Sequence, residues 1–95
     1  MAPEDPDIAV ALKYDKEQDN APRVVAKGLR LRAEKIRELA REYNVPVMKN
    51  TTLAESLYRV DVGQEIPEEL YDAVAEVLNF IFALQQEQLA AKKKE

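Results

Sequence analysis

The chain has 95 residues and a formal net charge of −4, which fits one small domain and argues against a nucleic-acid partner. It contains no cysteine and no histidine, so disulfides, thiolate metal sites and the commonest general base are excluded. Its two glycines are too few for a glycine-rich phosphate-binding loop. We therefore predict that the protein is not an enzyme and that it uses no cofactor and no metal.

The two ends of the chain differ in composition from its middle. Residues 1–7 are rich in proline and acids, which predicts a disordered lead-in, and residues 90–95 form a charged tail. Residues 8–89 then make up the folded domain. No stretch approaches the roughly 20 apolar residues of a transmembrane helix, and the N-terminus does not resemble a signal peptide. We expect a cytoplasmic protein that associates with a membrane only peripherally, through its partners.

The first half of the domain predicts a hairpin followed by a helix. Residues 8–14 and 23–27 are short apolar runs joined by a compact polar loop, a pattern typical of two antiparallel strands. Gly28 follows the second run, and a glycine there permits a sharp turn into a helix. Residues 29–43 place their apolar side chains on one helical stripe, which predicts that helix.

Residues 45–48, Val-Pro-Val-Met, predict a third strand, with the proline at an edge or at its start. Strand, helix and strand in this order predict a parallel, right-handed β-α-β unit. Thr52 and Glu55 have the spacing of a capping box, which predicts a short helix, and Pro67 opens a last helix running to about Leu89. The fold class is therefore α/β: a small mixed sheet of about three strands with about three helices packed around it.

The last helix is more apolar than packing on a small sheet requires. Its apolar residues cover roughly half the circumference at 100° per residue; they are Leu70, Tyr71, Val74, Ala75, Val77, Leu78, Ile81, Phe82 and Leu84. Either this helix also packs against the short helix before it, or part of the stripe is an exposed patch for a partner.

A series of segments carries a resemblance to a known family, in order and with compatible spacing. These segments are residues 9–15, 21–28, 36–38, 45–47, 53–54, 57–58, 63, 66–71 and 73–78. The pattern resembles the cytoplasmic C-terminal domain of the FlhB/YscU family of flagellar and type III secretion export-switch proteins. It looks closer to the flagellar branch than to the injectisome branch.

The resemblance implies a domain that acts at a membrane export gate and helps to switch export from rod and hook substrates to filament substrates. Family members cleave themselves within an Asn-Pro-Thr-His sequence just before the strand that residues 8–14 resemble. This chain has Glu-Asp-Pro-Asp at residues 4–7, without the asparagine and the histidine. We therefore expect a free-standing, non-cleaving form. The strand at residues 8–14 is then left at a sheet edge, where Lys13 and the prolines blunt it or where it pairs with another chain.

The resemblance also implies a binding surface. Flagellar relatives hold early export substrates, of the rod and hook type, in a small hydrophobic pocket that corresponds here to Ala21, Pro22, Ala75 and Leu78. We expect an accessory export domain that recognises such substrates or docks on export-gate components. The alternative is a decoy or chaperone-like protein that binds export substrates in the cytoplasm, away from the gate.

Overall fold

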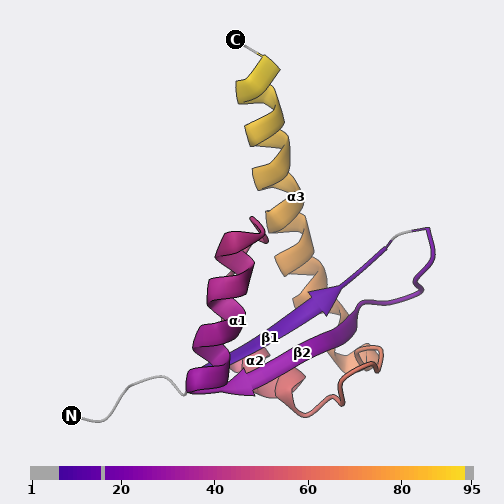
Figure 1. Ribbon diagram of the computed structural model, residues 1–95. Coiled ribbons are helices and arrows are strands. Elements are labelled where there is room, and N and C mark those ends of the chain that lie inside the picture. The colour runs from indigo at the N-terminus through magenta and orange to yellow at the C-terminus, as the bar shows by residue number, and fades with distance from the viewer. Residues whose placement is uncertain (1–6, 16, 94–95) are drawn as a thin grey trace.

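The computed structural model describes residues 7–15 and 17–93, and it describes side chains as far as Ala83. In this part of the chain, two strands and three α-helices form the fold, with a 3₁₀ turn before the last helix (Figure 1). The elements are β1 (Ile8–Lys13), β2 (Arg23–Leu29), α1 (Leu31–Glu42), α2 (Thr51–Tyr58), η1 (Glu68–Leu70) and α3 (Tyr71–Lys93). The α/β class and the small sheet with three helices around it are as predicted.

The sheet is an antiparallel hairpin, as the sequence predicted. Strands β1 and β2 pair from Ile8 opposite Leu29 to Lys13 opposite Arg23, with a bulge that leaves Val25 as an extra residue of β2. Because side chains alternate along a strand, the small residues of β1 and β2 face α1 and the larger ones face α2 and α3. The hairpin therefore lies between one helix on one face and two helices on the other.

Gly28 lets α1 approach the hairpin closely. A Cβ at this position would lie 2.4 Å from the Cβ of Arg32 on α1, and Ala33 on the same turn is completely buried. The expected role of Gly28 in the turn was wrong, since β2 continues through it. The turn into α1 is made at Arg30, whose φ is 53° and whose N–H donates to the carbonyl oxygen of Asp7 at 2.7 Å.

The opposite face of the hairpin carries the main apolar core. Leu53 and Leu57 of α2 meet Ile66 and Val74 there, and partly buried side chains of β1 and α3 pack around them. The predicted capping box at Thr52 was wrong. Helix α2 begins two residues earlier, at Thr51, and Asn50 caps it by accepting a hydrogen bond from the Leu53 N–H at 3.1 Å. At the C-terminal end of this helix, the Nζ of Lys27 from β2 donates a hydrogen bond to the carbonyl oxygen of Tyr58.

The predicted third strand was wrong, and with it the parallel β-α-β unit. Residues 45–48 form no strand and join no sheet. Residues 63–66 instead pair with the beginning of β2 at its outer edge, through backbone hydrogen bonds with Pro22 and Val24. The sheet is therefore two-stranded and antiparallel, and one irregular segment extends it on the β2 side.

The last helix begins after Pro67, as predicted, but its first turn is the 3₁₀ turn η1. Helix α3 then runs to Lys93 and not only to Leu89. It packs on the core through Ala73, Val74, Val77 and Leu78. None of the helices in the described part of the chain has both the length and the apolar character that crossing a bilayer requires.

Candidate functional site

A pocket of about 320 Å³ lies between α3 and the segments that flank β2. This volume is at the small end of the range of about 300–1,000 Å³ that ligand pockets occupy. Its lining residues are Tyr14, Asn20, Ala21, Pro22, Ile66, Tyr71, Val74, Ala75, Leu78, Asn79 and Phe82.

Backbone hydrogen bonds fix the wall opposite α3. The Ile66 N–H donates to the Pro22 carbonyl at 2.9 Å, and the Val24 N–H donates to the Gln64 carbonyl at 3.0 Å. Gly63 starts this segment with φ at 92° and donates to the Val24 carbonyl at 2.7 Å. A positive φ of this size suits glycine. The loop before β2 and the loop before η1 are thereby held together, and both contribute to the pocket.

Helix α3 supplies the other wall from successive turns. Tyr71, Ala75, Leu78 and Phe82 recur at helical spacing on the side that faces the pocket. Val74 lies beside them and is only 1% exposed, so it forms part of the core under the pocket. Because the side chain of Ala75 is small, part of the pocket stays open that a larger side chain at this position would fill.

The pocket is lined mainly by apolar side chains, and none of the described residues that line it is charged. Its polar groups are the two asparagine amides and the two tyrosine hydroxyls. The described part of the chain contains no group of three acidic, histidine or cysteine residues that could hold a metal ion. This chemistry suits the binding of an apolar group with a few hydrogen bonds at its margin.

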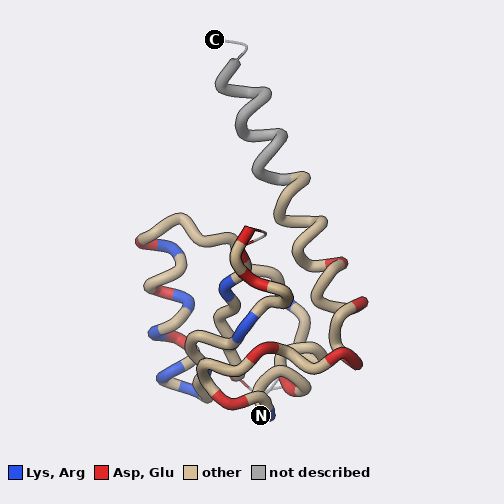
Figure 2. The backbone as a smooth tube through the Cα atoms, turned by 90° about the vertical axis from the view of Figure 1, so that its right-hand side faces the viewer, with Lys and Arg blue, Asp and Glu red and all other residues tan. Residues whose placement is uncertain are grey.

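Acidic residues surround the start of α3, whereas α1 carries four basic residues, Arg32, Lys35, Arg37 and Arg41 (Figure 2). The acids on η1 and the first turns of α3 are Glu68, Glu69, Asp72 and Glu76, and all four are exposed. Their negative field lies beside the pocket. A partner bound there meets an apolar centre with a negative margin.

The structure brings all four predicted site residues together at this pocket. Ala21 and Pro22 are buried, Leu78 is half-buried and packs on the core, and Ala75 is exposed. The sequence places Tyr71, Val74 and Phe82 on the apolar stripe of the last helix, but it does not single out these or the remaining lining residues as site residues. For Tyr71 and Phe82 the signal was present, because both continue the helical spacing of Ala75 and Leu78. For Ile66 and the two asparagines the sequence gives no comparable signal.

A protein-family model matches most of the chain. Residues 5–81 match the model described as the FlhB HrpN YscU SpaS family. The flagellar biosynthetic protein FlhB of Escherichia coli K12 is 47% identical over 87 residues, which is 90% of this chain and 23% of that protein. The Bacillus subtilis protein YlqH, described as uncharacterized, is 42% identical over 78 residues and matches over 84% of its own length. The chain thus spans less than a quarter of the E. coli FlhB that it matches.

Solved structures show the same fold. The cytoplasmic domain of FlhB from Shewanella putrefaciens is 47% identical, with a TM-score of 0.76 over 79% of this chain and 63% of that one. The C-terminal domain of PscU is 31% identical, with a TM-score of 0.75 over 83% of this chain and 99% of that one.

Proposed function

Because this chain belongs to the FlhB HrpN YscU SpaS family of export proteins, we propose that it is an accessory domain of flagellar protein export that recognises early, rod- and hook-type substrates. In this proposal the chain plays the same part as the cytoplasmic domain of the export switch protein. It reaches the membrane by docking on components of the export gate. The observation that carries this proposal is the apolar pocket at Ala21, Pro22, Ala75 and Leu78.

The shape of the pocket favours a peptide side chain as its ligand. The two alanines leave an apolar hollow, and the asparagine amides at its margin can pair with the backbone of an extended peptide. A partner that inserts an apolar side chain buries it against Val74 and Leu78, and each buried large side chain contributes about 1.5–3 kcal/mol. One or two such anchors give weak, reversible binding, which suits a domain that must release each substrate to the export gate.

The acidic residues beside the pocket also influence which charges are favoured in the peptide residues on either side of the inserted side chain. With Asp72 and Glu76 exposed beside Ala75, a neutral or basic flank is favoured over an acidic one. Because these groups are exposed, the preference weakens as salt is added, whereas the apolar contact does not.

The proposal includes the absence of self-cleavage. Residues 4–7 are Glu-Asp-Pro-Asp, so no asparagine amide is present before the proline to attack its own carbonyl carbon. Residues 4–6 lie outside the described part of the chain. The measurement is the intact mass of the protein after purification and prolonged incubation. A mass lower by the first five or six residues would contradict this part of the proposal.

The binding test uses one variant in the pocket and one outside it. Ala75→Asp places a charge at the exposed rim, whereas Phe80→Asp places the same charge on α3 at an exposed position that does not line the pocket. Isothermal titration with purified hook-type and filament-type export substrates should show hook-type binding by the wild type and by Phe80→Asp, and its loss in Ala75→Asp. Circular dichroism checks that both variants fold. Equal binding by the folded variants would contradict the pocket assignment.

A further inference from the structure

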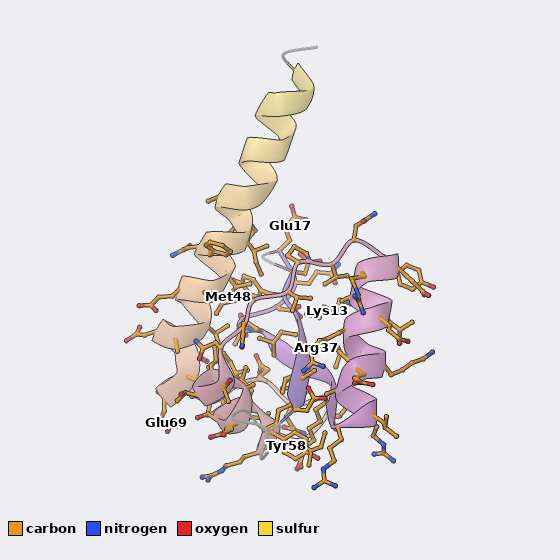
Figure 3. All side chains as sticks on the ribbon, turned by 90° about the vertical axis from the view of Figure 1, so that its left-hand side faces the viewer. Lys13, Glu17, Arg37, Met48, Tyr58 and Glu69 are labelled. Atoms are coloured by element: carbon orange, nitrogen blue, oxygen red, sulfur yellow. The ribbon has the colours of Figure 1, made fainter. Side chains whose placement is uncertain are left out.

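The outward side of α1 carries large apolar side chains. On the inward side, Ala33 packs on the hairpin and is completely buried, and Figure 3 shows Arg37 extending from the helix toward the hairpin. On the outward side, Leu31, Leu39 and Tyr43 are 80%, 40% and 74% exposed. A surface helix ordinarily turns polar residues to water on this side, so these three side chains need an explanation of their own.

The exposed apolar side chains belong to one row along the helix. Residues four apart lie next to one another on a helix surface, and the members of this outward row are Leu31, Lys35, Leu39 and Tyr43. Tyr43 follows the last residue of α1, but its N–H still donates to the Leu39 carbonyl oxygen at 3.0 Å, so it continues the row. At these exposures no described residue covers either end of the row, which makes it a candidate contact surface.

The charges beside the outward row indicate what covers it. The first half of α1 has the basic residues Arg32 and Lys35 there, and the second half has the acidic residues Glu38 and Glu42, all of them exposed. The same helix turned end for end therefore places acids against bases at both ends. The net charge of −4 on each copy does not oppose this contact locally, because α1 contains four basic and three acidic residues.

We propose that α1 pairs with α1 of a second copy of this chain, in the antiparallel direction, to form a weak two-fold symmetric dimer. An axis through the middle of α1 sets Leu31 of each copy against Tyr43 of the other, and Arg32 against Glu42. The contact involves one helix of 12 residues from each copy, far less than a stable interface of about 1,200–2,000 Å² requires. We therefore expect a dissociation constant of about 0.1–1 mM. Helix α1 lies on the face of the hairpin opposite α3, so the pocket stays open in both copies and the inference goes beyond the proposed function.

The test is sedimentation equilibrium of the full chain at low salt, from about 10 µM to 1 mM protein. Leu31→Ser removes an apolar contact at both ends of the paired helices. Arg32→Glu and Glu42→Arg each set like charges against one another, also at both ends. The matched controls are Arg59→Glu and Glu55→Arg, which change the net charge by the same amounts at exposed positions of α2 and just after it. Circular dichroism checks that every variant folds.

We expect the average mass of the wild type and of both controls to rise toward twice the monomer mass, and each α1 variant to weaken association by about ten-fold. The double variant Arg32→Glu/Glu42→Arg should associate like the wild type, because its opposite charges face each other again. An equimolar mixture of the two single variants should do the same, since each supplies the charge that the other has lost.

Three results would each overturn the proposal. They are a monomer at every concentration, equal association of the α1 variants and the controls, and no recovery in the double variant or in the mixture. Because none of these measurements involves an export substrate, their failure leaves the proposed function standing.

Discussion

The sharpest stability prediction concerns Lys27, which joins β2 to the end of α2. Its Nζ donates to the carbonyl oxygens of Tyr58 at 2.8 Å and Val60 at 3.0 Å, and it lies 4.9 Å from the centre of the Tyr58 ring. These carbonyls belong to the last turn of α2 and the residues after it, where helix acceptors lack intrahelical partners. One ammonium group therefore caps this helix end and ties it to the sheet.

Replacing Lys27 with methionine keeps most of the apolar stem and removes the charge. A hydrogen bond from a charged donor contributes about 1.5–3 kcal/mol, and an exposed cation–π contact contributes about 0.5–1 kcal/mol. Because Lys27 is only partly buried, we take the lower end and expect a loss of about 2 kcal/mol. For a domain of this size that lowers Tm by roughly 10 °C.

The assay is urea unfolding followed by circular dichroism, with Lys35→Met as the matched control. Lys35 is exposed on α1, so its replacement should change the free energy of unfolding by less than about 0.5 kcal/mol. Equal effects of the two substitutions, or a loss below about 0.5 kcal/mol for Lys27→Met, would refute the reasoning that this ammonium group caps α2.

Three further substitutions test the fold by the same unfolding assay. Gly28→Ala should destabilise by about 1–3 kcal/mol, because its Cβ would meet the Cβ of Arg32 at 2.4 Å; no change would mean that α1 can move away freely. Asn50→Ala should cost about 1 kcal/mol by leaving the Leu53 N–H without its cap, and an unchanged stability would place the cap elsewhere. Arg30→Gly should raise stability by up to about 1 kcal/mol, because φ at Arg30 is 53°; a loss would show that its side chain contributes more than the strain costs.

The local elements could be predicted because their signals lie within short stretches of sequence. The hairpin, both longer helices and the Pro67 helix start follow from alternation, helical spacing and turn residues, and their bounds shift by only a few residues. The third strand failed for a physical reason. Residues 45–48 have strand-forming side chains, but a strand needs a paired neighbour, and sequence pattern alone does not report whether one is present.

For the pocket too, the part formed by neighbouring residues on one helix could be predicted, whereas the part that depends on contacts between distant residues could not. Tyr71 and Phe82 follow from the helical spacing of Ala75 and Leu78 on α3, so the apolar part of the α3 wall could be predicted, whereas Asn79 could not. The opposite wall depends on the Ile66 N–H pairing with the Pro22 carbonyl. That contact joins residues far apart in sequence, and no periodic pattern encodes it. The meeting of Ala21 and Pro22 with α3 was expected only from the family resemblance.

Complementation tests the central claim most directly. The protein is expressed in a bacterial strain whose membrane-bound export switch lacks its cytoplasmic domain, and secretion of hook and filament proteins is measured, with Ala75→Asp and Phe80→Asp alongside. We predict that the wild type and Phe80→Asp restore secretion of hook-type substrates and that Ala75→Asp does not. No restoration by a folded wild-type protein at normal expression would contradict the account and would favour a decoy that acts away from the export gate.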